Sequence, residues 1–215
     1  MPTVMERVAA FGVVPVIAID RAADALPLAD ALIRGGLPVV EITFRTAAAA
    51  DVIRTLARQR PDLLVGAGTV LSPETVQTAV DAGAQFAVAP GLNPRVVLAA
   101  QELGLPFVPG VANPSDIEAG LELNCKLLKF FPAEALGGTR LLEALSAPYK
   151  HTGVMFMPTG GASLANLGAY LKIDTVAAVG GTWIAKKEDL AEGRWDVIAE
   201  RCREARALVQ SLRGS

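Results

Sequence analysis

Two kinds of segment alternate along the chain, distinguished by how their apolar residues are spaced. Short runs rich in Val, Ile and Leu have no polar face, which is typical of strands buried on both sides of a parallel sheet. Their starts lie 20 to 27 residues apart, a spacing that suits one strand, one helix and two short loops. The predicted strands are Val13–Ile19, Val39–Thr43, Leu64–Gly68, Phe86–Ala89, Phe107–Pro109, Leu127–Phe130, Val154–Pro158 and Thr175–Val179.

The longer segments between these runs repeat apolar residues every three or four positions, which predicts amphipathic helices. Ser72-Pro73 and Asn113-Pro114 resemble helix starts, with a capping side chain followed by proline. Gly83 follows one segment, where a left-handed helix end favours glycine. The predicted helices are Ala25–Ile33, Ala48–Arg58, Glu74–Ala82, Arg95–Leu103, Asp116–Leu123, Thr139–Leu145, Leu164–Leu171 and Asp196–Leu212.

Eight strand–helix units without a break in composition predict one domain, residues 1–215, folded as a closed (β/α)₈ barrel of the TIM type. A short N-terminal helix is expected before the first strand. The alternative fold is an open, doubly wound parallel sheet. Both folds place ligands at the carboxyl ends of the strands, so candidate chemistry is sought there.

Composition excludes several classes of function. The mean hydropathy of +0.39 argues against disorder, and no apolar stretch approaches the roughly 20 residues of a membrane span. A formal charge of −2 gives no basic surface for nucleic acid. Cys125 and Cys202 lack disulfide or metal spacing, and His151 is the only histidine. We therefore expect a reduced, cytoplasmic protein with no multi-histidine zinc site.

Lys129 stands in the middle of the apolar strand Leu127–Phe130, whereas the other five lysines lie in loop-like or helical contexts. Burial would strip water from its amine and disfavour the charged form. A neutral amine can attack a ketone, and the resulting iminium accepts electrons from a breaking bond. The structural alternative is an ion pair with a carboxylate inside the barrel, or a side chain that extends to the rim.

A matching carboxylate lies in the second strand. Glu41 interrupts the apolar run Val39–Thr43, and Arg45 follows the end of that run. A buried carboxylate near an amine is a candidate general base. The Arg45 guanidinium could bind a substrate carboxylate through two parallel hydrogen bonds. An ordinary ion pair of Glu41 with a basic residue explains the same pattern.

Two double-glycine segments follow the last two strands. Gly160-Gly161 comes after the seventh strand and Gly180-Gly181-Thr182 after the eighth. Phosphate sites of barrel enzymes are often built from these two loops, where glycine lets backbone N–H groups approach an anion. Tight turns also require glycine, so turn chemistry is the alternative explanation.

Taken together, these segments resemble one known family, the class I 2-keto-3-deoxy-6-phosphogluconate (KDPG) aldolases, which include the 4-hydroxy-2-oxoglutarate (KHG) aldolases. The most specific segments are K-F-F-P-A-E at 129–134 and V-G-A-G-T-V-L at 65–71. The resemblance runs in family order from about residue 13 to 184. Further matching segments are Val14–Ile17, Gly35–Leu37, Glu41–Thr46, Ala89–Leu92, Pro109–Val111, Pro158–Gly161 and Gly180–Trp183.

The resemblance implies a lyase of the Entner–Doudoroff pathway that needs no metal or other cofactor and assembles as a homotrimer. Its substrate would be a small 2-keto acid, with the phosphorylated KDPG as the first expectation. Lys129 matches the Schiff-base lysine and Glu41 the proton-transferring carboxylate. The other matches are Arg45 and Thr69 for the pyruvyl carboxylate, Pro90 and Phe131 for the pocket wall, Thr159 for the face of the aldehyde, and Gly160, Gly161, Gly180, Gly181 and Thr182 for the phosphate.

The chain departs from the family pattern at two positions near the expected phosphate. The family commonly has serine where Thr182 stands, and the added methyl group crowds the site. Some members carry a basic residue where this chain has Ala18, and Arg21 could compensate for it. KDPG, its galactonate epimer and KHG share the pyruvyl half of the molecule, so the resemblance leaves the choice among them open.

Two readings of a different class stay open beside the aldolase. A phosphate-binding barrel isomerase or epimerase would use Lys129 as a charge stabiliser, so Lys129→Arg would then keep activity. A catalytically silent relative would bind a sugar phosphate and act through a partner. An assay of pyruvate release separates both from an aldolase.

Overall fold

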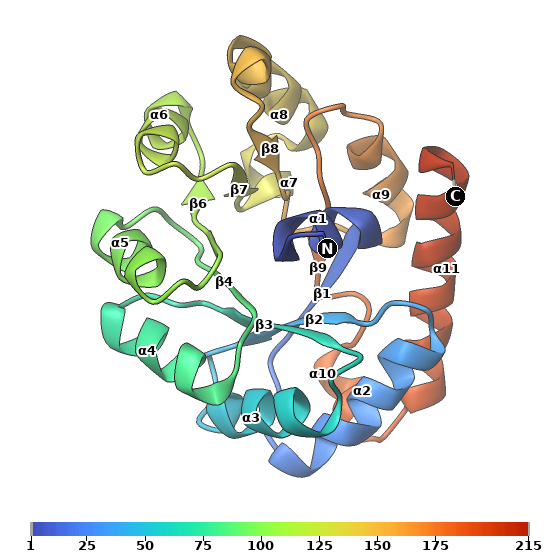
Figure 1. Cartoon of the computed structure of the whole chain (residues 1–215). Helices are drawn as coiled ribbons and strands as arrows, with labels where there is room; N and C mark the ends of the chain where they lie inside the picture. Colours follow the sequence, from blue (N-terminus) through green and yellow to red (C-terminus); the bar gives the residue numbers. More distant parts are fainter. Residues whose placement is uncertain (1, 215) are drawn as a thin grey trace.

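Residues 2–214, which the computed structural model describes, form nine short strands with helices around them (Figure 1). Valine, isoleucine, leucine and small residues fill both faces of the strands, and the apolar faces of the helices cover them. The strands are β1 Val13–Ile17, β2 Val39–Thr43, β3 Leu64–Gly68, β4 Phe86–Val88, β5 Phe107–Val108, β6 Gly110–Val111, β7 Leu127–Phe130, β8 Met155–Phe156 and β9 Val179–Gly181.

All the named strand pairs are parallel. Six strands form one sheet in the order β5-β4-β3-β2-β1-β9, and three form a second in the order β6-β7-β8. Isolated parallel bridges join Phe156 to Val176 and Thr159 to Gly180, so the segment around β8 lies beside the segment around β9. The fold is therefore α/β, with a curled parallel sheet.

The fifth strand differs from the prediction because it is divided. The sequence predicted one strand at Phe107–Pro109, whereas β5 pairs with β4 and β6 pairs with β7 on either side of Pro109. Proline has no N–H to donate to a neighbouring strand, so the ladder stops there. The Pro109 carbonyl still accepts a hydrogen bond from the Lys129 N–H at 2.8 Å.

The last strand also lies later than predicted. The apolar run Thr175–Val179 favoured a strand, but the ladder to β1 begins only at Val179, whose N–H donates to the Gly12 carbonyl at 2.9 Å. Of the earlier residues, Val176 makes only an isolated bridge. The apolar pattern indicates burial of this run but does not contain the register with β1 that defines β9.

The eight predicted helices and the short N-terminal helix are all confirmed, with ends that differ by at most two residues. Two short helices, α7 and α10, were not predicted because they are too short to show a period. The helices are α1 Val4–Phe11, α2 Ala25–Arg34, α3 Ala49–Gln59, α4 Pro73–Ala82, α5 Pro94–Glu102, α6 Pro114–Glu122, α7 Ala133–Leu136, α8 Gly138–Ser146, α9 Leu164–Leu171, α10 Lys187–Ala191 and α11 Trp195–Arg213.

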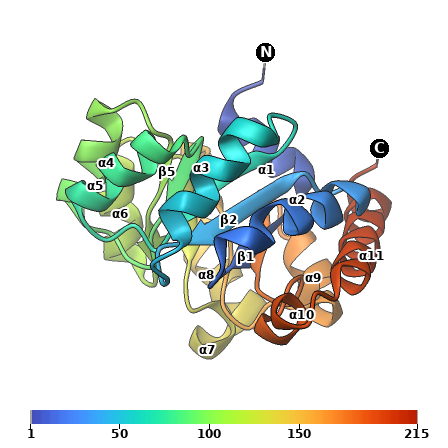
Figure 2. The ribbon, with the colours of Figure 1, turned by 90° about the horizontal axis from the view of Figure 1, so that it is seen from below.

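The two ends of the curled sheet are covered differently. Helix α1 lies across the centre of the molecule in Figure 1, and Figure 2 places it at the opposite end of the molecule from α7 and α10. Because α7 follows β7 and α10 follows β9, the end opposite α1 is where the strands finish. Among residues 2–214, no helix is long and apolar enough to span a bilayer.

Candidate active site

Lys129 and Glu41, the charged residues in the predicted strands, meet inside the curled sheet. The Lys129 ammonium nitrogen lies 3.6 Å from Oε1 of Glu41. Lys129 comes from β7 and Glu41 from β2, which belong to different sheets, so the side chains meet across the interior. Lys129 is 5% exposed and Glu41 is fully buried. The nucleophile and the general base expected from the sequence are therefore adjacent and shielded from water.

The Glu41 carboxylate has an unusual environment for a buried charge. Neither of its oxygens has a hydrogen-bond partner within the described part of the chain. Buried carboxylates normally accept several hydrogen bonds, because desolvation is otherwise expensive. A structural ion pair would satisfy these oxygens more fully. The geometry instead leaves acceptor positions available beside the amine.

Glycines in the segment 65–71 make room for this carboxylate. A Cβ atom added to Gly68 would lie 2.2 Å from Oε1 of Glu41, and one added to Gly66 would lie 2.2 Å from the Phe86 ring. In the ladder between β2 and β3, Gly68 stands opposite Thr43 and Gly66 opposite Glu41. The absence of a side chain at Gly68 thus leaves room for the Glu41 carboxylate, and its absence at Gly66 leaves room for the Phe86 ring.

Thr69 follows β3 directly and has a positive φ of 57°. A β-branched residue in this left-handed conformation is uncommon and strained, by about 1–2 kcal/mol. Such strain concentrates at functional sites, where the surrounding structure maintains it. The backbone observation is independent of the family resemblance, and it singles out the same threonine at the end of the strand.

Phe131 and Pro90 lie close to the lysine. The Lys129 ammonium lies 5.3 Å from the centroid of the Phe131 ring, within cation–π distance. Gly110 stands opposite Lys129 in the ladder between β6 and β7, and a Cβ added to it would lie 2.1 Å from the Pro90 carbonyl. The Pro90 backbone therefore packs against the strand beside the lysine.

The structure brings together the two loops expected to bind phosphate. Thr159 forms a parallel bridge with Gly180, and a Cβ added to Gly180 would lie 2.3 Å from Oγ1 of Thr159. Gly160 and Gly161 have φ values of 98° and 83°, which other residues rarely adopt. The turn itself thus requires both glycines. Thr182, after β9, is exposed.

The hydrogen bonds that hold the loop after β8 were not predicted from the sequence. The N–H groups of Ala133 and Glu134 donate to the carbonyls of Thr159 and Gly160 at 2.8 and 3.0 Å. The buried Tyr170 hydroxyl donates to the Glu134 carboxylate. Burial, together with this bond to a carboxylate, holds the pKa of Tyr170 well above its usual value. Glu134 therefore links the loop that contains Gly160 to Tyr170 of α9 and holds that loop in place.

A cavity of about 400 Å³ opens at the strand ends. Its wall includes Val16, which stands opposite Glu41 in the ladder between β1 and β2, and Arg45. One lining residue is thus the ladder neighbour of Glu41, although neither Glu41 nor Lys129 itself lines the cavity. Its wall also includes Lys186 and Lys187, which sequence reasoning missed. The only signal for them was their position a few residues beyond Gly180–Thr182.

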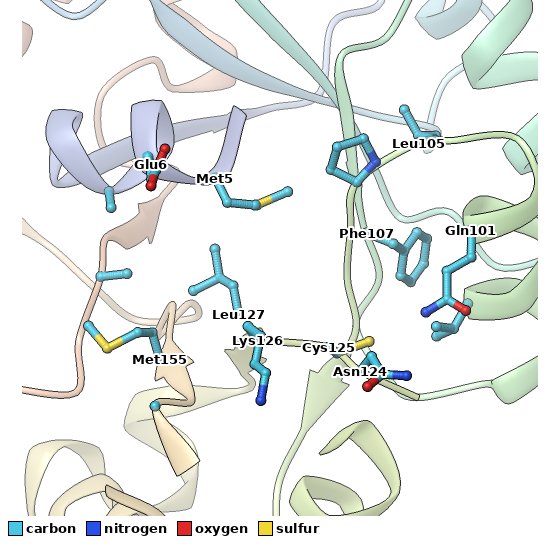
Figure 3. Close-up of a pocket in the computed structure, with 15 residues that line it drawn as sticks. Met5, Glu6, Gln101, Leu105, Phe107, Asn124, Cys125, Lys126, Leu127 and Met155 are labelled. Atoms are coloured by element: carbon cyan, nitrogen blue, oxygen red, sulfur yellow. The ribbon is translucent and has the colours of Figure 1, made fainter. Parts of the chain in front are cut away.

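A second cavity, of about 440 Å³, lies at the other end of the curled sheet (Figure 3). Met5 of α1, Leu127 at the start of β7 and Met155 at the start of β8 line it, so its surface is mainly apolar. Cys125 also lines it, and burial raises the pKa of that thiol to about 11. None of the predicted site residues lines this cavity, whereas Arg45 and Thr182 line the one at the strand ends, which is therefore the candidate site.

No group of three or more His, Cys, Asp or Glu side chains within residues 2–214 is placed to bind a metal ion.

Comparison with known proteins yields consistent matches over most of the chain. Residues 4–201 match the model of a family described as KDPG and KHG aldolase. The chain is 47% identical over 207 residues to the 2-dehydro-3-deoxy-phosphogluconate aldolase of Haemophilus influenzae, covering 96% of this chain and 97% of that protein.

Two solved structures are similar in fold and sequence. The Legionella pneumophila KDPG aldolase, with pyruvate captured as a covalent carbinolamine, has a TM-score of 0.90 and 41% identity, covering 95% of this chain and 98% of that one. The Zymomonas mobilis 2-keto-3-deoxy-6-phosphogluconate aldolase with 3-phosphoglycerate has a TM-score of 0.86 and 37% identity, covering 95% of each chain.

Proposed function

The chain belongs to the KDPG and KHG aldolase family, and we propose that it cleaves KDPG to pyruvate and glyceraldehyde 3-phosphate through a Schiff base on Lys129. It is accordingly an aldolase, a carbon–carbon lyase. The observation that carries the proposed mechanism is the buried contact of 3.6 Å between the Lys129 amine and the Glu41 carboxylate. This contact supplies a nucleophile and a proton acceptor within one water-excluded site.

The reaction begins when the neutral Lys129 amine attacks C2 of the keto acid and water leaves, which gives an iminium. Glu41 takes the proton of the C4 hydroxyl group, and the C3–C4 bond breaks. The electrons of that bond move into the iminium to form an enamine, and C4 departs as an aldehyde. Glu41 then returns the proton to C3, and water hydrolyses the new iminium to release pyruvate and the free amine.

Residues around the pair would position the substrate. Arg45 and Thr69 bind the pyruvyl carboxylate in this scheme, and Pro90 and Phe131 enclose the pyruvyl carbons. The carbinolamine captured in the Legionella protein supports attack by the amine on pyruvate. No metal or organic cofactor takes part, because the iminium itself draws electrons from the breaking bond.

The far end of the substrate extends toward the loops after β8 and β9. Thr159 would select the face of the aldehyde, and backbone N–H groups of Gly160, Gly161, Gly180 and Gly181, with the Thr182 hydroxyl, would bind the phosphate. The 3-phosphoglycerate in the Zymomonas structure supports a phosphorylated ligand in this fold.

Borohydride reduction in the presence of pyruvate tests the chemistry. The protein should gain one reduced pyruvate per chain on the peptide that contains Lys129, and Lys129→Arg should lose both the adduct and KDPG cleavage. Lys126→Arg is the matched control, because Lys126 is exposed and lines the opposite cavity. Lys129→Arg protein that still cleaves KDPG would refute the mechanism and favour the role of charge stabiliser.

Cleavage rates for KDPG, its galactonate epimer and KHG, measured by pyruvate release, decide the substrate. The proposal requires the highest kcat/KM for KDPG. A higher value for KHG would make the chain a KHG aldolase that uses the same Schiff base.

For the whole molecule we propose a single domain in which the two sheets close into one (β/α)₈ barrel. The bridges between the segments of β8 and β9, and the single residue between β5 and β6, support this closure. We also propose a homotrimer in the cytoplasm. Leu71, Leu98 and Leu103 are exposed large apolar side chains in or next to α4 and α5, where a contact between copies would cover them.

A further inference from the structure

The residues directly after β1 include no basic side chain at Ala18, and Arg21, which could compensate for it, is paired elsewhere. Ala18, one residue after β1, lines the cavity at the strand ends and carries no charge. Arg21, three residues later, donates two hydrogen bonds to Asp24, at 2.9 and 2.8 Å. The Asp24 side chain is only 11% exposed, so this bidentate pair directs the guanidinium toward the start of α2.

Two lysines from a different element reach the same place. The cavity at the strand ends is lined by Ala18 and Thr182 and also by Lys186 and Lys187, which precede and begin α10. With Arg45, the wall carries three basic side chains and one acidic side chain, Asp20. A dianionic group such as phosphate is therefore attracted to this wall of the cavity.

The lysine segment has a fixed position. The carboxylate of Asp189, 1% exposed, accepts a hydrogen bond from the Lys186 N–H at 3.1 Å and another from the Arg201 guanidinium of α11. The Lys187 ammonium lies 3.1 Å from Oδ2 of Asp20, three residues after β1. Both side chains of this pair are more than half exposed, so the pair is solvent-screened and can open for a phosphate, unlike that of Arg21 with the nearly buried Asp24. These contacts place both lysine stems at the rim of the cavity rather than on a loose loop.

We propose that Lys186 and Lys187 are the cations that bind the phosphate of the substrate and that they replace the basic residue absent at Ala18. This inference rests on the proposed function, since it names the residues that select a phosphorylated keto acid. Both side chains are exposed, so each adds a solvent-screened, charge-assisted hydrogen bond to the backbone donors after β8 and β9.

The test compares two substrates that differ only in the phosphate, KDPG and 2-keto-3-deoxygluconate. For each enzyme, the measured quantity is the ratio of kcat/KM for KDPG to kcat/KM for the unphosphorylated acid. A charge-assisted hydrogen bond corresponds to about tenfold in affinity, so the double variant Lys186→Ala/Lys187→Ala should lower this ratio at least about tenfold. The loss should appear mainly in KM, and it should shrink as salt is raised.

Two controls locate the effect. Lys172→Ala removes an exposed lysine that does not line the cavity and should leave the ratio unchanged. Arg21→Ala should also leave it unchanged, because that guanidinium pairs with Asp24. A ratio that falls in Arg21→Ala, but not in the double lysine variant, would overturn the inference.

Binding of inorganic phosphate, followed by amide NMR titration, tests the lysines without turnover. Wild-type protein should bind phosphate with shifts at Thr182 and its neighbours, and the double variant should bind it more weakly. Equal binding by both proteins, or none by wild type, would refute the lysine site. Absence of a pyruvate adduct on Lys129 in wild type would instead refute the proposed function, and the two failures are thus distinguishable.

Discussion

Replacing Gly68 with alanine perturbs the carboxylate of Glu41, the proposed general base, without altering any charged group. Gly68 does not have a positive φ, so alanine fits its backbone conformation. The new Cβ, however, would lie 2.2 Å from Oε1, 2.7 Å from Cγ and 2.8 Å from Cδ of Glu41. Ordinary contacts of these atoms exceed 3.4 Å, so the Glu41 side chain must move by about 1 Å.

The size of the effect follows from the packing. Glu41 is fully buried, and Gly68 is paired with Thr43 in the ladder between β2 and β3, so neither can shift freely. Overpacking of this kind costs about 1–3 kcal/mol, or roughly 2–10 °C in Tm for a chain of this length. A displacement of about 1 Å from the amine can lower turnover about a hundredfold.

The assay measures KDPG turnover by coupled pyruvate release, together with thermal unfolding and borohydride trapping. We expect turnover to fall about a hundredfold while pyruvate still forms an adduct on Lys129. Gly168→Ala is the matched control. Gly168 lies within α9, and a Cβ added to it would meet only Leu208 and Leu212 of α11, at 3.7–4.0 Å. This substitution should raise the free energy of unfolding by about 0.5–1 kcal/mol, because alanine favours a helix more than glycine does. If the Gly68→Ala variant kept the turnover and the Tm of the wild-type protein, the inference that Gly68 leaves no spare room for Glu41 would be wrong.

Three other changes address the surroundings of the site. Thr69→Gly should relieve strain of about 1 kcal/mol, seen in urea unfolding, yet raise KM because the hydroxyl is lost. Burial raises the pKa of Cys125 to about 11 and of Cys202 to about 12, so at pH 8 iodoacetamide should label the folded protein at least about a hundredfold more slowly than the unfolded protein; equal rates would contradict this burial. Burial alone would raise the pKa of Asp189, but bonds from Arg201 and the Lys186 N–H lower it below its usual value. Asp189→Asn should therefore lower the free energy of unfolding by about 1–3 kcal/mol at pH 7. This difference from wild type should shrink as the pH falls from about 4 through the lowered pKa of Asp189, where the wild-type carboxylate becomes protonated. A difference that persists at acidic pH would refute the role of the charge.

The sequence contained enough information to predict the helices and most strands, because burial on both sheet faces and on one helix face leaves a period. It also singled out the two residues that we propose as the catalytic pair. Lys129 and Glu41 each interrupt an apolar strand, and an isolated charge in such a run must face either the interior or the helices. The distance of 3.6 Å between them required the structure, since β2 and β7 are far apart in the sequence.

Other features depend on contacts that leave no periodic signal. The division of the fifth strand depends on which neighbour each side of Pro109 pairs with. The start of β9 depends on its register with β1. Lys186 and Lys187 follow the last strand as an ordinary charged pair, and only the folding of α10 against Arg201 of α11 brings them to the cavity.

Glu41 takes part in two proton transfers in the proposed cycle, and both carboxylate oxygens lack a hydrogen-bond partner within residues 2–214. In the proposed cycle the proton leaves an oxygen on C4 and later arrives at C3, one bond away. A carboxylate held by further donors would have to break those bonds in mid-reaction. Glu41 accepts none from residues 2–214, so no hydrogen bond to the chain has to break when the carboxylate takes up or returns the proton. The same oxygens can act in the synthetic direction, when the enamine of pyruvate joins an incoming aldehyde.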